Sequence, residues 1–168
     1  PAHLNPAVTL AFAIIGKVSW SVVLPFIIAQ MIGAFLGAVV VWIQYYPHWQ
    51  ATDDQSAILG TFATGPAIRS PFANLMSEII GTFVLVFALL ALTRGQFTEG
   101  LNPLVVGVII TAIGLSLGGT TGYAINPARD LGPRMAHAVL PSANKGDSDW
   151  QYSWIPVIGP FVGGIVGA

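Results

Sequence analysis

Cysteine and charge are what this 168-residue chain has least of. The absence of cysteine excludes disulfides and thiolate metal sites, and it gives no information about the redox compartment. Only 8% of the residues are charged, against about 25% in soluble domains. A net charge of −1 gives no sign of a nucleic-acid partner. The 54% hydrophobic fraction indicates a membrane protein. The alternative is a large soluble protein with buried helices, but such a protein needs a charged face toward water, and almost none is present here.

Long apolar runs divide the chain. Residues 20–45, 72–93 and 101–119 each reach the ~20 residues that cross a hydrocarbon core. Residues 154–168 form a fourth apolar run, which the end of the sequence cuts short. Since the sequence also begins without Met, we expect a piece of a longer protein, with three complete spans and part of a fourth.

Two shorter apolar stretches follow the same tripeptide. Asn-Pro-Ala occurs at residues 5–7 and again at residues 126–128. Each copy predicts a helix start, because Asn is a preferred N-cap and Pro suits the first helical position. The apolar stretches that follow, residues 6–15 and 127–140, are too short to cross a membrane. Such half-helices are tolerated in a membrane only where their irregular ends are buried or line an aqueous cavity.

The chain also repeats itself. Downstream of the two tripeptides lie the runs QMIGAFLGA and PFVGGIVGA, in which Gly33 pairs with Gly37 and Gly163 with Gly167 at a spacing that favours close helix packing. The second unit consists of span, span, half-helix and span. Because three spans is an odd number, successive units must lie in opposite orientations. We therefore expect an inverted repeat whose functional site lies near the midplane, at the discontinuous helices.

These features resemble the aquaporin family. The resemblance rests on two Asn-Pro-Ala motifs on half-helices, in the segments HLNPAVTLA and GYAINPARDLGP, and it covers essentially the whole chain. It implies an all-α membrane protein built as an inverted repeat of three spans plus a re-entrant half-helix, with the first two helices and the end of the last outside the sequence. The single channel domain would consist of residues 1–45 from the first repeat, residues 46–71 as a connecting loop and residues 72–168 as the second repeat.

The resemblance also maps the narrowest point of a pore onto Gly114, Tyr123, Arg129 and a second-helix residue outside the sequence. Water-selective members carry His at the position of Gly114 and usually a small residue at that of Tyr123. Gly widens the constriction, whereas Tyr supplies an aromatic wall for a carbon backbone. Arg129 offers fixed donors to successive hydroxyls. Such an amphipathic lining predicts a passive channel for glycerol and other small uncharged solutes, with water. The alternative is a channel mainly for water, or for urea, dihydroxyacetone, hydrogen peroxide or lactic acid.

The motifs are expected to exclude ions and protons at the midplane. Two half-helices that meet with their N-termini point the positive ends of their dipoles at the pore, which disfavours cations. The motif side-chain amides would donate to a passing oxygen, and extended segments before each motif would offer carbonyl acceptors. The implied motif residues are Asn5, Pro6, Ala7, Asn126, Pro127 and Ala128, and the implied carbonyls are those of Ala2, His3, Leu4, Gly122, Tyr123, Ala124 and Ile125.

Several polar residues have expected supporting roles. By resemblance, Glu78 is a buried acid that accepts hydrogen bonds from the amides of the second motif loop. Asp130 lies in the first turn of a half-helix, where a carboxylate favours the positive end of the dipole and can bond free amides. We expect Arg134 to face the interface or a loop carboxylate, Gln30 to bond across helices, and the ring of His3 to brace its neighbours. No metal is expected at His3, since no second ligand lies at a workable spacing.

Other function classes fit less well. No nucleophile–base pair can be assembled, so an enzyme is not expected, and no cofactor is implied. A secondary transporter would show more coupling carboxylates near the helix breaks than Glu78 alone, and an occluded junction protein would need bulk at Gly114. The resemblance implies a homotetramer in the lipid bilayer of the cell membrane. The positive-inside rule does not settle orientation, but by resemblance the side of Lys17 and Arg94 is cytoplasmic and the loop over residues 47–71 is extracellular.

Overall fold

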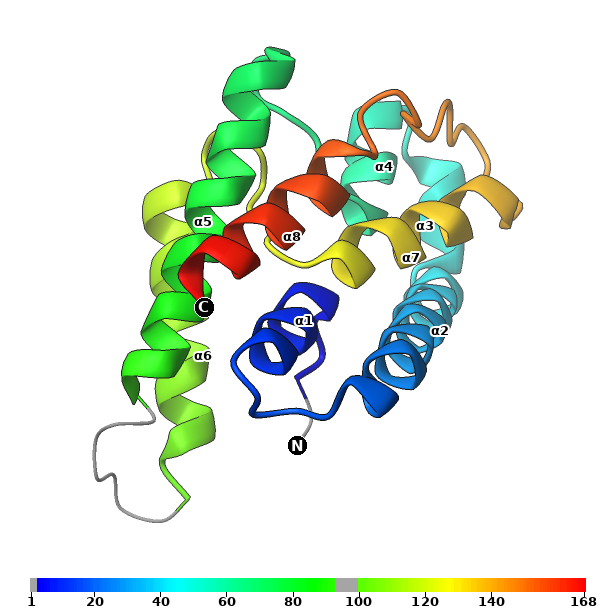
Figure 1. Ribbon diagram of the computed structural model, residues 1–168. Coiled ribbons are helices and arrows are strands. Elements are labelled where there is room, and N and C mark those ends of the chain that lie inside the picture. Colours follow the sequence, from blue (N-terminus) through cyan, green and yellow to red (C-terminus); the bar gives the residue numbers. More distant parts are fainter. Residues whose placement is uncertain (1–2, 93–99) are drawn as a thin grey trace.

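The computed structural model describes residues 3–92 and 100–168, and within these ranges all regular structure is helical (Figure 1). The elements are α1 (Pro6–Ile14), α2 (Trp20–Gln44), α3 (Tyr46–Ala51), α4 (Gln55–Phe62), α5 (Pro71–Leu92), α6 (Asn102–Leu117), α7 (Pro127–Val139) and α8 (Ile155–Gly167). The two half-helices expected from the sequence are therefore α1 and α7, and they begin at the proline of each motif.

The long helices frame the two half-helices. Helix α5 stands beside α6 and packs chiefly against α8, while α2 packs against α7 (Figure 1). Helices α1 and α7 lie between these two groups, and α8 contacts both of them. The segments that carry α3 and α4 and residues 140–154 lie at one end of the molecule, which we call the loop face.

Two of the described helices, α2 with 25 residues and α5 with 22, are long and apolar enough to cross a membrane. The span expected over residues 101–119 is shorter than predicted, since α6 has 16 residues and ends at Leu117. Two glycines, Gly118 and Gly119, follow Leu117, and glycine is a weak helix former. The chain leaves the helix here and turns into the segment before the second motif.

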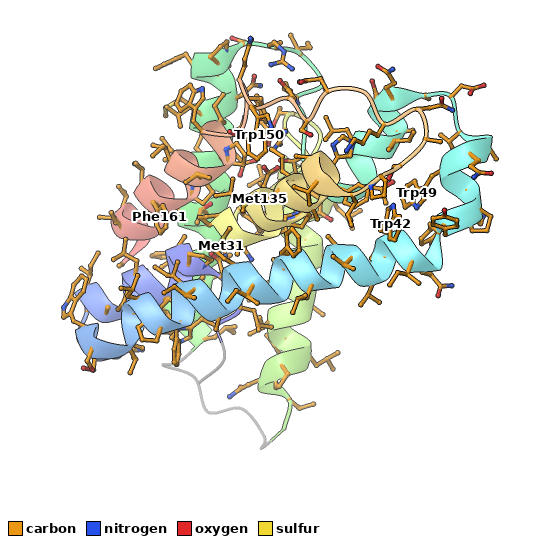
Figure 2. The ribbon with its side chains drawn as sticks, turned by 90° about the vertical axis from the view of Figure 1, so that its right-hand side faces the viewer. Met31, Trp42, Trp49, Met135, Trp150 and Phe161 are labelled. Carbon is orange, nitrogen blue, oxygen red and sulfur yellow. The ribbon has the colours of Figure 1, made fainter. Side chains whose placement is uncertain are left out.

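The connecting region over residues 46–71 is more ordered than a plain loop, because it contains α3 and α4. Asp54 caps α4, and its carboxylate accepts hydrogen bonds from the amides of Ser56 at 2.8 Å and Ala57 at 3.2 Å. Tryptophan side chains hold the region to the end of α2, where the indole of Trp49 donates to the carbonyl of Trp42 at 2.8 Å (Figure 2). Such aromatic side chains are enriched where a membrane meets water.

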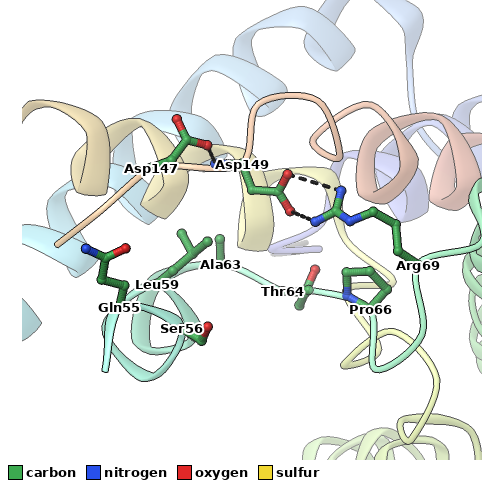
Figure 3. A pocket seen from close by; sticks show the side chains of 11 residues that line it. Gln55, Ser56, Leu59, Ala63, Thr64, Pro66, Arg69, Asp147 and Asp149 are labelled. Atoms are coloured by element: carbon green, nitrogen blue, oxygen red, sulfur yellow. Dashed lines mark hydrogen bonds and ion pairs between the residues drawn. The ribbon is translucent and has the colours of Figure 1, made fainter. Parts of the chain in front are cut away.

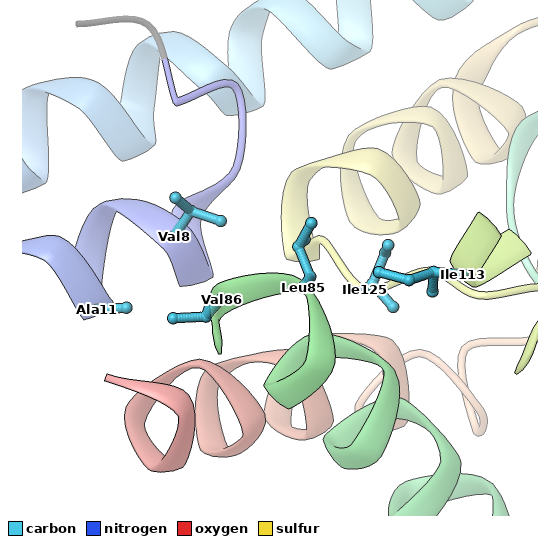
Figure 4. Close-up of a cluster of buried hydrophobic side chains, with 6 residues drawn as sticks. All are labelled: Val8, Ala11, Leu85, Val86, Ile113 and Ile125. Atoms are coloured by element: carbon cyan, nitrogen blue, oxygen red, sulfur yellow. The ribbon is translucent and has the colours of Figure 1, made fainter. Parts of the chain in front are cut away.

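A buried apolar cluster fixes the depth of α1. It joins α1, α5, α6 and the segment before the second motif, and its members are Val8, Ala11, Leu85, Val86, Ile113 and Ile125 (Figure 4). Burying an aliphatic side chain of this size contributes about 1.5–3 kcal/mol. The cluster therefore holds the N-terminal turns of the first half-helix against the middle of the long helices.

A stripe of glycines lets α8 approach the backbone of α5. A Cβ atom at Gly163 would overlap the carbonyl oxygen of Ile79, and one at Gly159 would lie 2.6 Å from the Cβ of Glu78. Gly167 continues the stripe, 3.0 Å from the carbonyl oxygen of Phe83 by the same measure. The prediction of close packing at Gly163 and Gly167 is confirmed, and Gly159 extends it by one turn.

The corresponding glycines of α2 behave differently. Among the described residues, no atom lies within 4 Å of a Cβ built at Gly33 or Gly37. Helix α2 instead meets α7 at Gly132, where an added Cβ would lie 2.8 Å from the Cβ of Ala34. The close approach of these two helices therefore depends on a glycine of the half-helix.

We expect Gly163→Ala to lower the thermal stability of the protein. Overpacking of this kind costs about 1–3 kcal/mol, against a gain in helix propensity of up to about 1 kcal/mol. Gly60→Ala is the matched control, because it gains the same propensity on α4 while no atom lies within 4 Å of the new Cβ. Thermal unfolding in detergent should rank Gly163→Ala below the unmutated protein and Gly60→Ala at or above it. A Gly163→Ala protein that melts with the control would contradict the packing argument.

Candidate pore and selectivity filter

Each motif asparagine caps its own half-helix. The side-chain oxygen of Asn5 accepts a hydrogen bond from the amide of Ala7 at 2.9 Å. That of Asn126 accepts from the amides of Ala128 at 3.0 Å and Arg129 at 3.2 Å. The motif prolines, Pro6 and Pro127, begin the two helices, where a missing N–H leaves no hydrogen bond unmade. The repeated tripeptide is thus a helix start in both places.

Each motif asparagine also binds the residues that lead into the other motif, which we call that motif's approach segment. The side-chain nitrogen of Asn5 donates to the carbonyl of Ile125 at 2.8 Å, and that of Asn126 donates to the carbonyl of Leu4 at 2.8 Å. The half-helices therefore meet N-terminus to N-terminus, with the positive ends of both dipoles at the centre of the molecule. Each side-chain nitrogen carries two hydrogens and uses one in this contact, so the second remains for a solute.

The approach segments are not the extended strands expected from the sequence. Three residues other than glycine have left-handed backbones there, with φ of 54° at Leu4, 41° at Tyr123 and 42° at Ile125. Gly122 has a φ of 79°, which costs a glycine little. For residues other than glycine, this left-handed conformation costs about 1–3 kcal/mol each, and it persists only where the surrounding structure fixes it.

The expected row of carbonyl acceptors is therefore partly occupied. The carbonyls of Leu4 and Ile125 already accept from the motif asparagines, so each has only its second lone pair for a solute. Ala2 lies outside the described residues. The acceptor role of His3, Gly122, Tyr123 and Ala124 stays a prediction from the resemblance.

Glu78 holds the left-handed segment before the second motif. One carboxylate oxygen accepts from the hydroxyl of Thr121 at 2.7 Å and the amide of Ala124 at 3.0 Å. The other oxygen accepts from the amide of Ile125 at 2.8 Å. The side chain is buried, and three donors converge on it, which are the contacts that the resemblance implies for this acid.

A cavity of about 350 Å³ runs between the half-helices and the long helices α5 and α6. Its wall is apolar on the side of α5 and α6 and polar where the motifs meet. The lining residues are His3, Leu4, Asn5, Val8, Leu85, Leu89, Val106, Ile110, Tyr123, Ala124, Ile125, Asn126 and Arg129. A second cavity of about 390 Å³, on the side of α2, shares Leu4, Asn126 and Arg129 with it. The motif residues thus lie at the junction of the two spaces.

Tyr123 and Arg129 both line the first cavity, whereas Gly114 does not line it but lies behind the ring of Tyr123. A Cβ atom at Gly114 would lie 2.9 Å from Cζ of the Tyr123 ring, so any larger side chain would displace that ring. Gly118, one turn further along, leaves room for the same ring, and we did not identify it from the sequence. The signal was present, since residues four apart on a helix share a face.

Arg134 is buried, and the expectation that it faces the interface or a loop carboxylate is wrong, because its carboxylate partner lies on α7 itself. Its guanidinium bonds the carboxylate of Asp130 one turn earlier on α7, with Nε 2.8 Å from Oδ1. It also donates to the carbonyls of Thr64 and Ser148, each at 2.8 Å. Five fixed donors allow one guanidinium to satisfy a carboxylate and loop carbonyls together. The amide that Asp130 bonds is that of Thr64, at 2.7 Å, in the connecting region and not in its own helix.

Thr9 joins the first motif to α2. Its hydroxyl donates to the carbonyl of Asn5 at 3.0 Å and accepts from the side chain of Gln30 at 3.0 Å. The ring of His3 lies 3.1 Å from the same hydroxyl and packs edge-on against Phe12. The prediction that Gln30 bonds across helices is therefore confirmed, and the His3 ring contacts both α1 and, at Phe26, α2.

A separate cavity of about 560 Å³ opens at the loop face, and an ion pair crosses its rim (Figure 3). The guanidinium of Arg69 lies 2.6 Å from a carboxylate oxygen of Asp149. This neighbouring carboxylate raises the pKa of Arg69 above its usual value. The Arg69 side chain is 55% exposed and that of Asp149 is 20% exposed, so solvent screens the attraction between the two charges.

An all-helical membrane protein in which two capped half-helices meet between two cavities is built as a channel. The chain belongs to the major intrinsic protein family, whose model, described as "Major intrinsic protein", matches residues 1–168. It is accordingly a multi-pass integral membrane channel and not an enzyme.

Known proteins resemble the chain over nearly its whole length. It is 70% identical to "Glycerol uptake facilitator protein 3" of Lactiplantibacillus plantarum and 62% identical to "Glycerol uptake facilitator protein" of Bacillus subtilis. These matches cover 100% and 99% of the chain and 70% and 61% of the two relatives. The X-ray structure of the aquaglyceroporin from Plasmodium falciparum matches with a TM-score of 0.85 at 32% identity, covering 98% of this chain and 69% of that one.

We expect Glu78→Gln to damage the segment before the second motif. The amide keeps one acceptor oxygen but presents an NH2 group to a backbone N–H, and a buried donor left unpaired costs about 1–3 kcal/mol. Solute flux through reconstituted protein and melting temperature in detergent should both fall. Asn74→Asp is a useful comparison on the same helix, because Asn74 is also buried but bonds only Ser70 and Ile68 near the loop face. Equal solute flux through the Glu78→Gln protein and the unmutated protein would show that the segment does not need the carboxylate.

Proposed function

We propose that this chain forms a passive channel for glycerol and other small uncharged solutes, with water, that excludes ions and protons. The observation that carries the proposal is the pairing of Gly114 with the ring of Tyr123 beside Arg129. Gly114 leaves the space that the ring fills, and the ring in turn forms part of the cavity wall.

A three-carbon polyol has one apolar side and one side that carries hydroxyls, and the cavity has matching walls. Leu85, Leu89 and Val106 give an apolar surface along α5 and α6. Arg129 and the motif amides supply donors on the opposite side. A solute with both characters can thus exchange its water shell for protein contacts along the cavity.

Ion exclusion follows from charge at the same place. The two half-helix dipoles point their positive ends at the midplane, and Arg129 adds a fixed positive charge beside them. A water molecule that accepts hydrogen bonds from both motif asparagines directs its own hydrogens outward. A chain of waters therefore cannot carry a proton through this point in one direction.

The names of the relatives support glycerol over the other neutral solutes. The relatives at 70% and 62% identity are named glycerol uptake facilitators, whereas a "D/L-lactic acid transporter" of Lactiplantibacillus plantarum is 44% identical over 98% of the chain. Undissociated lactic acid is also a small three-carbon solute that bears hydroxyls. Paired flux measurements with glycerol and lactic acid separate the two functions.

We also propose that the channel is a homotetramer with one pore within each protomer. Helix α2 is apolar and largely exposed, and a Cβ atom at Gly37 meets nothing among the described residues, whereas Gly33 lines the cavity on the side of α2. Small residues on an exposed apolar helix favour association in lipid. The family resemblance implies four copies.

Chemical cross-linking in mild detergent tests this assembly. We expect a ladder that ends at four protomers and does not grow when the protein concentration is raised, because a closed ring leaves no free interface. Cross-linking of the protein dissolved in strong denaturant is the control for random collision. Only monomers at every concentration, or an open-ended ladder, would count against the tetramer.

The double substitution Gly114→His with Tyr123→Cys tests glycerol selectivity. The imidazole enters the space that the Tyr123 ring occupied, and the aromatic wall is lost, so a polyol loses both room and apolar contact. We expect glycerol flux into liposomes, followed by light scattering, to fall roughly tenfold, which corresponds to about 1.4 kcal/mol of barrier. Water flux should change much less.

Tyr123→Phe is the matched control, because it keeps the ring against Gly114 and removes only the hydroxyl. It should retain most of the glycerol flux. If the double variant still passes glycerol, the selectivity filter lies elsewhere. If the unmutated protein passes water but no glycerol, the proposed function itself is wrong.

A further inference from the structure

We propose that Thr64, in the connecting region, is a positioning residue for solute selectivity because it ties the two walls of the filter to each other. One wall is Arg129 on α7, and the other is Tyr123 in the segment before the second motif. The proposal rests on the proposed function for its solute, but it concerns a residue that does not line the cavity between the motifs.

All the polar groups of Thr64 are bound to α7. Its amide and its hydroxyl both donate to one carboxylate oxygen of Asp130, at 2.7 Å and 2.6 Å. Its carbonyl accepts from the guanidinium of Arg134 at 2.8 Å. The residue is 5% exposed, and a hydroxyl bonded to a buried carboxylate is among the stronger hydrogen bonds in proteins.

These contacts reach the first wall directly. Asp130 follows Arg129 in the first turn of α7, so a displacement of one moves the other. The buried ion pair between Asp130 and Arg134 spans one turn of the helix and ties it to the carbonyl of Ser148 as well. Thr64 is therefore joined to the turn of α7 that presents the filter arginine.

The opposite face of Thr64 packs on the second wall. A Cβ atom built at Gly122 would lie 3.4 Å from both Cβ and Cγ2 of Thr64, so the Thr64 side chain lies beside this glycine with room for about a methyl group between them. Three residues further on, the amide of Ala67 donates to the carbonyl of Thr120 at 3.0 Å. Gly122 immediately precedes Tyr123, and its left-handed backbone sets the direction in which that residue leaves the turn.

Thr64 thus lies between the two walls on the loop face, at the edge of the cavity shown in Figure 3. Its hydroxyl binds Asp130 beside Arg129, and its methyl group lies beside the glycine that precedes Tyr123. We expect the width of the filter to depend chiefly on the hydroxyl, because it is the group of the Thr64 side chain that bonds α7. Selectivity is consequently set in part from the connecting region.

Two substitutions separate the two contacts. Thr64→Val keeps the methyl group beside Gly122 but replaces the hydroxyl, and so its bond to Asp130, with a second methyl group, whereas Thr64→Ser keeps that bond but removes the methyl group. Each variant is reconstituted in liposomes in measured amounts, and the glycerol and water fluxes are recorded on the same preparation. We expect Thr64→Val to change the ratio of glycerol flux to water flux roughly threefold or more, about 0.65 kcal/mol in relative barrier. Thr64→Ser should change it by less than half as much on the same energy scale.

A loss of folded channels would lower both fluxes in proportion and leave their ratio unchanged, and that result overturns the proposal. It is overturned equally if Thr64→Ser shifts the ratio as much as Thr64→Val does. If the unmutated protein passes water but no glycerol, the proposed function fails separately. The ratio of urea flux to water flux then replaces the glycerol ratio, with the same expectations for the two variants.

Discussion

Two hydrogen bonds at the centre of the molecule determine the rest of the arrangement. Asn5 and Asn126 each cap a half-helix with the side-chain oxygen and bind the approach segment of the other with the side-chain nitrogen. A helix that stops at mid-depth leaves backbone groups that lipid cannot bond, at several kcal/mol each. The caps, the crossed bonds and Glu78 together satisfy much of this demand. The buried cluster around α1 and the glycine stripe of α8 bring the two ends to the same depth.

Local signals in the sequence were sufficient to predict where the two half-helices begin. An Asn followed by Pro favours a helix start, and α1 and α7 begin at those prolines. The spacing of Gly163 and Gly167 correctly predicted contact with another helix, whereas the same spacing at Gly33 and Gly37 meets no neighbour among the described residues. Such features depend on neighbouring residues in the chain. They can therefore be read before the fold is known.

The supports of the filter could not be predicted in this way. Asp130 binds Thr64 across 66 positions, and Arg134 binds the carbonyl of the same residue across 70, so neither contact leaves a spacing pattern. Gly114 and Gly118 leave room for a ring that comes later in the chain, at Tyr123, and this contact leaves no local signal on α6. The left-handed residues of the approach segments also escaped prediction, because a sequence favours extended backbone at Ile and Leu unless a distant acid fixes another conformation.

The crossed asparagine bonds bear on where such a channel can be regulated. Each motif amide is held at both its oxygen and its nitrogen, so rotating it would break hydrogen bonds in both halves of the protein together. A gate at the midplane would have to pull the half-helices apart. At the loop face, by contrast, Arg69 and Asp149 form a pair that solvent reaches, with side chains that are 55% and 20% exposed. The centre of the pore is therefore the part of the molecule that is least able to move without breaking contacts between its two halves.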